Sequence, residues 1–129
     1  MKQWAEDELR ALTEQVIGFC IQIHKTLGPG LLESAYAACL THELIKSGLA
    51  FKREEPITIK YDNVVIDCAY RLDFVIEDVL ILELKSVEKL ERIHQAQVLT
   101  YLKLSGLLIA LLINFNVPML KDGVVRLRK

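Results

Sequence analysis

The sequence predicts an α/β domain, and two changes in residue pattern carry that prediction. Apolar residues recur at steps of three and four over residues 7–28, 31–48 and 87–106, which is the spacing of amphipathic helices. Residues 56–85 are instead rich in β-branched and aromatic residues, which favours strands. The predicted order of elements is α-α-β-β-β-α-β-β.

The predicted helices end at glycines, and the predicted strands are joined by short turns. Gly28-Pro29-Gly30 closes the first helix, Ser47-Gly48 the second and Gly106 the third. Asp62-Asn63 and Glu77-Asp78 are turn signals, so three strands within residues 56–85 should form an antiparallel meander. Residues 107–114 predict a fully buried strand, and a short hairpin arm turning at residues 121–123 is expected after Pro118.

Length and composition describe an ordinary globular chain. Its 129 residues are expected to form one domain, 1–129, because that length lies near the usual domain size. The chain is 52% hydrophobic and 26% charged, with 16 basic and 17 acidic residues and a formal net charge of −1. That balance gives no general attraction to nucleic acid, so any such binding would need basic charge gathered on one face.

The N-terminus and the cysteines point to a cytoplasmic protein. Residues 1–10 are polar and acidic, unlike a signal peptide, and the longest apolar run, Gly106 to Ile113, is shorter than the about 20 residues that span a bilayer. No membrane contact is therefore expected. Cys20, Cys39 and Cys68 lie far apart without a C-x-x-C spacing, so we expect buried reduced thiols rather than a zinc or iron–sulfur site.

Three charged residues, Asp73, Glu83 and Lys85, lie in segments that otherwise read as sheet core. A two-residue turn between their strands would put Asp73 and Glu83 on opposite faces, whereas a three-residue turn, Glu77 to Val79, sets them directly opposite each other. We expect the second register, although it brings a β-branched Val79 near a position that often needs positive φ. Glu83 and Lys85 are two residues apart on one strand, so they share a face.

This arrangement suggests a metal site. Two carboxylates held about 4–5 Å apart repel each other, and a hard divalent cation removes the repulsion. We expect Mg²⁺, with Mn²⁺ as a substitute, on Asp73, Glu83 and the backbone carbonyl of Leu84, with waters and phosphate oxygens as further ligands. Lys85 would hold or help deprotonate a metal-bound water, or stabilise charge that develops at phosphorus. The alternative is a salt bridge from Lys85 to either carboxylate, with no metal bound.

Two helices add polar groups to otherwise apolar faces. Glu33 shares a helix face with Tyr36 and Leu40, where a carboxylate is costly unless it is paired or faces a metal. It also lies in the first turn, where the helix dipole by itself favours negative charge. Gln97, with Tyr101 one turn further on, is explained either by a hydrogen bond in the core or by a ligand contact.

These residues together resemble a known family over almost the whole chain. The stretch GLLESAY, ending at Tyr36, looks like the G-x-x-E-x-x-Y signature of the GxxExxY family. Asp73 followed by ELK, residues 83–85, resembles the D…(D/E)-x-K core of the PD-(D/E)xK nuclease superfamily, and QVLTY, residues 97–101, looks like the Q-x-x-x-Y motif of its RecB-like and Cas4-like branches. Leu72, not a proline, precedes Asp73, and the superfamily often lacks that proline. The four cysteines of the Cas4-like cluster are not present, so no iron–sulfur centre is implied.

The resemblance implies a restriction-endonuclease-like core, which is a mixed β-sheet flanked by helices with the active site at the edge of the sheet. It makes Asp73 and Glu83 metal ligands, Lys85 the catalytic lysine and Glu33 a carboxylate that binds or orients the metal or a water. The side chains that it assigns to phosphate contact or to support of the site are Gln97 and Tyr101.

The function implied by this resemblance is Mg²⁺-dependent hydrolysis of phosphodiester bonds in nucleic acid, DNA more than RNA. The alternative is a non-catalytic nuclease-fold module that binds nucleic acid or a protein partner. Because the chain carries no evident DNA-recognition module, a nuclease of this size would need a homodimer, a partner or recognition of structure rather than sequence.

Overall fold

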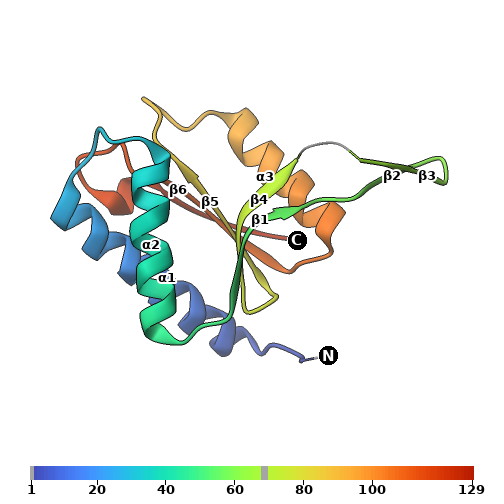
Figure 1. Ribbon diagram of the computed structural model, residues 1–129, viewed down its shortest axis with the longest axis horizontal. Coiled ribbons are helices and arrows are strands. Elements are labelled where there is room, and N and C mark those ends of the chain that lie inside the picture. The colour runs from blue at the N-terminus through green and yellow to red at the C-terminus, as the bar shows by residue number, and fades with distance from the viewer. Residues whose placement is uncertain (1, 68–69) are drawn as a thin grey trace.

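A five-stranded mixed sheet forms the centre of the protein in a computed structural model, which describes residues 2–67 and 70–129 (Figure 1). The strand order is β1-β4-β5-β6-β7, where the pair β5–β6 is parallel and the other neighbouring pairs are antiparallel. The predicted fold class, a mixed sheet flanked by helices, is therefore confirmed. The bounds of the sheet strands are β1 (Phe51–Pro56), β4 (Arg71–Ile76), β5 (Leu80–Lys85), β6 (Ile109–Asn114) and β7 (Val124–Arg128).

The helices cover the two faces of this sheet. Helices α1 (Glu6–Leu27) and α2 (Glu33–Ser47) pack on one face, and α3 (Arg92–Ser105), which connects the parallel strands β5 and β6, packs on the other (Figure 1). On β5, Leu82 lies in the cluster with α1 and α2, whereas Ile81 lies in the cluster with α3. Because side chains alternate along a strand, Glu83 and Lys85 face the α3 side with Ile81.

The helix ends follow the predicted signals. Gly48 and Gly106 follow α2 and α3 in the left-handed conformation, with φ of 79° and 75°, which glycine adopts without strain. Helix α3 begins at Arg92, later than the predicted start near residue 87. The backbone N–H of Glu91 donates to His94 Nδ1 at 2.8 Å, so the His94 side chain caps the N-terminus of this helix.

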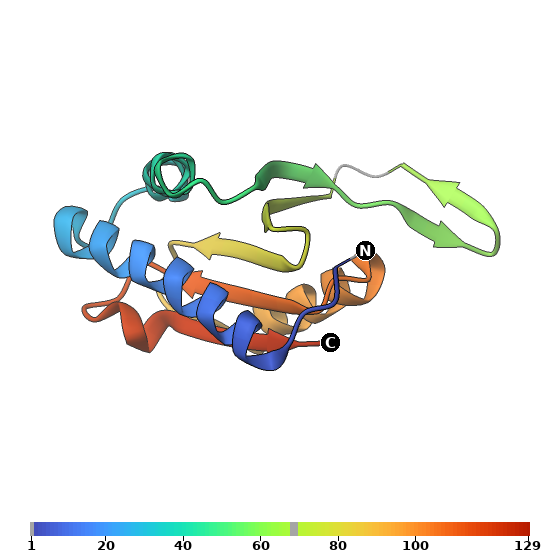
Figure 2. The same ribbon diagram turned by 90° about the horizontal axis from the view of Figure 1, so that it is seen from below.

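The predicted meander of three strands is wrong, since residues 51–85 contain five strands. The turn at Asp62-Asn63 is confirmed, with φ of 54° and 65°, but it joins β2 (Ile59–Tyr61) to β3 (Val64–Ile66) in a separate two-stranded sheet. This hairpin projects from the body (Figure 2). All three residues of β3 are exposed, so the strand has no buried face to place against the core.

The expected C-terminal arm also differs in the structure. Residues 121–123 belong to a 3₁₀ helix, η1 (Leu120–Gly123), and β7 runs back along β6 as an edge of the main sheet. A Cβ atom on Gly123 would lie 2.2 Å from the carbonyl oxygen of Asn114, so only glycine allows this turn to lie so close to β6. Strand β6 itself is fully buried, as predicted.

The prediction of buried thiols is confirmed for Cys20 and wrong for Cys39, which is half-buried. Cys20 and Cys39 are free thiols. Cys20 is buried, and burial raises the pKa of its thiol to about 12. Cys68 lies outside the described residues.

Candidate active site

The register of β4 against β5 places Asp73 opposite Glu83. Phe74 pairs with Leu82 and Ile76 with Leu80, so three residues form the turn, as predicted. The left-handed positions of this turn are Glu77 and Asp78, with φ of 52° and 54°. The β-branched Val79 therefore avoids the strain expected of it and lies buried in the core instead.

Beside Asp73 and Glu83, hydrogen bonds from backbone N–H groups to side-chain carboxylates link β4 and β5. The backbone N–H of Asp73 donates to Glu83 Oε2 at 2.7 Å, and the backbone N–H of Leu84 donates to Asp73 Oδ2 at 2.9 Å. Each carboxylate is thus anchored to the opposite strand through one oxygen. The other oxygen of each carboxylate is free of such a backbone bond, which leaves it able to accept from a ligand or bind a cation.

Burial makes this pair of carboxylates electrostatically costly. Glu83 is 5% exposed, and burial raises its pKa to about 8, with the neighbouring Asp73 charge adding to the rise. Burial likewise raises the pKa of Asp73, while its bond from the Leu84 N–H and the charge of Lys85 act against that rise. At neutral pH the pair therefore favours a shared proton or a bound cation over two free negative charges.

Lys85 lies on the same face of β5 and is half-buried. Its positive charge lowers the pKa of both Asp73 and Glu83. Among the described residues, the ion pairs of the structure do not include one between Lys85 and either carboxylate. The salt-bridge alternative is thus not what the geometry shows, and the ammonium group is left available near the acidic pair.

The donor set fits a hard divalent cation that keeps part of its water shell. Mg²⁺ commonly takes one or two protein carboxylates and completes its shell with water and phosphate oxygens. In the part of the chain that the structure describes, no group of three or more acidic, histidine or cysteine side chains could hold a metal ion together. Asp73 and Glu83 would be the two protein carboxylates of such a site. The carbonyl of Leu84 stays a predicted further ligand.

Glu33 is a predicted site residue that the structure does not group with Asp73 and Glu83. It is the first residue of α2 and is exposed, while Tyr36 and Leu40 on the same helix are fully buried. The burial expected for its carboxylate is therefore absent, and its position at the helix start suits the helix dipole. Its role toward a metal stays a prediction.

The tyrosine of the GLLESAY stretch has a structural role. The hydroxyl of Tyr36 donates to the Gly28 carbonyl at 2.6 Å and accepts from the Leu31 N–H at 3.1 Å. Its ring stacks on Phe115, with 4.2 Å between the ring centroids. The Ser86 hydroxyl then donates to the Leu31 carbonyl at 2.6 Å. The loop between α1 and α2 is thereby fixed next to the end of β5, one residue beyond Lys85.

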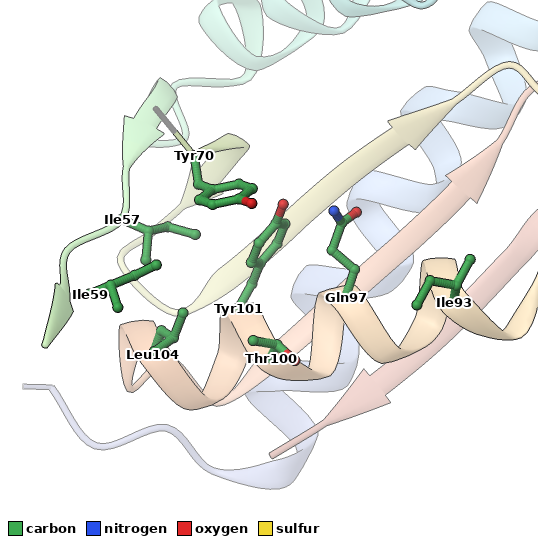
Figure 3. Close-up of a pocket in the computed structure, with 8 residues that line it drawn as sticks. All are labelled: Ile57, Ile59, Tyr70, Ile93, Gln97, Thr100, Tyr101 and Leu104. Atoms are coloured by element: carbon green, nitrogen blue, oxygen red, sulfur yellow. The ribbon is translucent and has the colours of Figure 1, made fainter. Parts of the chain in front are cut away.

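Gln97 and Tyr101 lie on the sheet-facing side of α3 and line a pocket with Tyr70 (Figure 3). Burial raises the pKa of the Tyr101 hydroxyl, and the charge of Glu83 adds to the rise. Tyr101 is therefore close enough to the acidic pair to sense its field. Gln97 is half-buried and makes no side-chain hydrogen bond within the described chain, so the core hydrogen bond offered as one explanation for it is not formed there.

Asn114 is a site-supporting residue that sequence reasoning missed. It pairs with Lys85 across β5 and β6 and is 1% exposed. Its side-chain oxygen accepts from the Val87 N–H at 3.0 Å, and its side-chain nitrogen donates to the Val87 carbonyl at 2.9 Å. These bonds hold the segment that follows Lys85. In the sequence, this role is indicated only by an amide side chain directly after the apolar run that ends at Ile113.

Arg53 is a second supporting residue, and it fixes the other side of Asp73. Its Nε donates to the Asp73 carbonyl at 3.4 Å and its NH1 nitrogen to the Thr41 hydroxyl at 3.1 Å. Its guanidinium lies 4.4 Å from the centre of the Phe74 ring. This side chain therefore connects β1, β4 and α2 beside the acidic pair.

Comparison with known proteins agrees with this fold. The sequence profile described as the PD-(D/E)XK nuclease superfamily matches residues 10–127. That match covers most of the chain, and the protein belongs to the PD-(D/E)XK nuclease superfamily. Its mixed sheet flanked by helices is consistent with a restriction-endonuclease-like core. No curated protein and no solved structure matches the chain.

The helices contain no candidate for a bilayer crossing: within the described residues, none is both long enough and apolar enough.

Proposed function

We propose that this protein is a metal-dependent nuclease that hydrolyses phosphodiester bonds of nucleic acid with a metal-activated water. The observation that carries the proposal is the cross-strand pair of Asp73 and Glu83, in which each carboxylate is anchored by a backbone N–H of the other strand. A buried Glu83 beside a half-buried Asp73, both with raised pKa values, is costly to a fold, and perturbed groups of this kind cluster at functional sites.

The proposed roles follow from the position of each group. Asp73 and Glu83 would hold Mg²⁺ or Mn²⁺, with the carbonyl of Leu84 as a further ligand. The metal, when bound, supplies positive charge and lowers the pKa of a coordinated water. Lys85 would orient that water or stabilise negative charge at the phosphorus, because it shares a face of β5 with Glu83, its charge acts on both carboxylates, and it forms no ion pair with either among the described residues.

The proposal gives the remaining assigned residues supporting roles. Gln97 and Tyr101 would contact the substrate or support the site from α3, and Glu33 would act from the start of α2. The GLLESAY stretch supports placing the chain in the GxxExxY group of the superfamily, since Tyr36 there fixes a loop beside the end of β5. The proposal also includes a single domain over residues 1–129, a cytoplasmic location, a preference for DNA over RNA, and a homodimer as one route to substrate recognition.

A cleavage panel tests the proposed activity. Purified protein is incubated with single-stranded, duplex, flapped and hairpin nucleic acids, in Mg²⁺, in Mn²⁺ and in chelator, beside the variants Asp73→Asn and Asp78→Asn. Asp78 is the matched control because it is an exposed acid in the turn between the same two strands. We expect metal-dependent cleavage that Asp73→Asn abolishes and Asp78→Asn preserves. Equal cleavage by both variants would remove the acidic pair from the mechanism.

The second candidate is a nuclease-fold module that binds nucleic acid or a protein without cleaving. The formal net charge of −1 favours the protein-binding form of this candidate, because it gives the chain no general attraction for nucleic acid. Thermal unfolding with Mn²⁺ separates the two candidates. If Mn²⁺ leaves the melting temperature unchanged and Asp73→Ala raises it, the carboxylates are a cost to the fold rather than a metal site.

A further inference from the structure

A pocket of about 360 Å³ lies between α3 and the base of the β2–β3 hairpin. Its volume lies within the usual range for small-molecule sites. Figure 3 shows that its walls come from both elements. The lining residues are Ile57, Ile59, Tyr70, Ile93, Gln97, Thr100, Tyr101 and Leu104.

The lining combines aromatic and apolar surface with a few neutral polar groups. None of the eight lining side chains is charged. The hydroxyls of Tyr70 and Tyr101 and the amide of Gln97 point into the same space (Figure 3). The Gln97 amide, which lines the pocket, can both donate and accept. The pocket therefore suits a flat, uncharged ring with hydrogen-bonding groups on its edge.

This pocket adjoins the acidic pair. Tyr101 packs in one cluster with Leu72, the residue before Asp73, and with Ile81, which is two residues before Glu83 on the same face of β5. The charges of Glu83 and Asp73 both act on the Tyr101 hydroxyl, which agrees with that placement. A group that occupies the pocket thus lies next to the place where a metal-bound phosphate would be held.

We propose that this pocket binds the unpaired base of a nucleotide beside the scissile phosphate, so that the substrate is single-stranded or contains an extruded nucleotide. The inference rests on the proposed nuclease function and adds the substrate class to it. A base is flat, uncharged and rich in edge donors and acceptors, and it stacks well on tyrosine. A base inside a duplex has both faces and its pairing edge already occupied, so it would have to leave the stack to enter.

Variants of two tyrosines test the pocket. Tyr70 is 51% exposed at the pocket, and Tyr61 is 73% exposed at the end of β2, outside the pocket. Tyr70→Leu removes an aromatic wall, while Tyr61→Leu makes the same change elsewhere and is the matched control. Affinity for labelled single-stranded DNA and RNA is measured by fluorescence anisotropy with Ca²⁺ in place of Mg²⁺, and cleavage is measured with Mg²⁺. The melting temperature of each variant is recorded.

We expect Tyr70→Leu to weaken binding about tenfold and Tyr61→Leu to change it less than about twofold, since stacking of one base on an aromatic ring accounts for a loss of that order. An abasic nucleotide, scanned along the strand, should produce a similar loss at one position near the cleavage site. That position should show no further loss with Tyr70→Leu, because both changes remove the same contact. Blunt duplex should bind more weakly than the single strand.

The outcomes separate this inference from the proposed function. If the wild-type protein cleaves but Tyr70→Leu matches Tyr61→Leu and no abasic position matters, the base pocket is wrong and the nuclease function stands. If the wild-type protein neither binds nor cleaves any nucleic acid, the proposed function fails and the inference fails with it. Preference for intact duplex would also overturn the inference.

Discussion

The two faces of β5 have the same strand geometry and opposite energetic roles. Leu80, Leu82 and Leu84 face α1 and α2 and are at most 2% exposed. Glu83 and Lys85 face the other way, toward α3. Burial of a leucine stabilises the fold, whereas burial of a carboxylate beside a second carboxylate destabilises it. One strand thus carries stability on one face and candidate chemistry on the other.

The acidic face of β5 depends on its apolar face. The raised pKa values of Asp73 and Glu83 show that the fold holds both groups where their charged forms are disfavoured. Only a rigid sheet can keep them there, and the leucine face supplies that rigidity. Substitutions on the two faces should therefore change stability in opposite directions, and the metal should matter for one face alone.

The largest expected effect is a loss of stability on the apolar face. Leu82→Ala should lower the free energy of unfolding by about 2–5 kcal/mol, because it leaves a cavity in a fully buried cluster. Urea denaturation measures this loss. Leu99→Ala, on a side chain that is 44% exposed, is the control and should lose much less. A similar loss in both variants would mean that the apolar face of β5 is not the centre of stability.

The second effect concerns Asn114, which pairs with Lys85 and binds the backbone of Val87. Asn114→Ala should cost about 1–3 kcal/mol, because it leaves the buried polar groups of Val87 without their amide partner. It should also loosen the segment after Lys85 and lower cleavage. Asn116→Ala is the control, since Asn116 has one longer bond to the same carbonyl, at 3.3 Å. Hydrogen exchange at Val87 would reveal the loosening, and unchanged exchange in Asn114→Ala would contradict it.

The third substitution, Glu83→Gln, should raise the free energy of unfolding rather than lower it, and the size of that effect should depend on pH. The pKa of Glu83 is raised from 4.5 in the unfolded chain to about 8 in the fold. Between these values the unfolded state has released a proton that the folded state keeps, so stability should fall as pH rises from about 5 to 8. Glu83→Gln should reduce this slope and stabilise the metal-free protein at pH 8 by about 1 kcal/mol or more.

Adding Mg²⁺ to the same stability measurement tests whether Glu83 binds a metal. By binding the folded state alone, Mg²⁺ should restore stability to the wild-type protein at pH 8 and give little to Glu83→Gln. Urea midpoints at pH 5 and pH 8, with Mg²⁺ and with chelator, provide the four values that are needed for each protein. A wild-type midpoint that rises with pH in chelator would show that Glu83 is ionised in the fold and that the site is built differently.

The predictable part of this structure is the part with a local signal. Residues 79–82 and 107–113 are apolar runs, and the buried strands β5 and β6 include most of each. The turn at Glu77-Asp78 has a local signal too, but its length does not, since the three-residue turn brings Val79 near a position that often needs positive φ. Chemistry decided between the two turn lengths: only the three-residue turn sets Asp73 opposite Glu83, and that register is confirmed.

The missed parts depend on contacts between distant residues. Strand β1 contains FKREEP, whose charges and proline are typical of a loop, and it becomes a strand only by pairing with β4. Asn114 gains its role from Val87, which is 27 residues away in the chain. Glu33 was expected on a buried face from helical spacing, but the first turn of α2 extends beyond the core, and spacing alone cannot show where a core ends.

The smallest expected effect on folding tests the chemistry most directly. Lys85→Met keeps the apolar stem of the side chain and removes the charge, so the free energy of unfolding should change by no more than about 0.5 kcal/mol. Metal-dependent cleavage should nevertheless be lost, because no other cation acts on both Asp73 and Glu83 within the described residues. Lys103→Met, on the exposed part of α3, is the control and should cleave normally. Cleavage by Lys85→Met at the wild-type rate would leave the acidic pair and its metal as the whole of the catalytic centre.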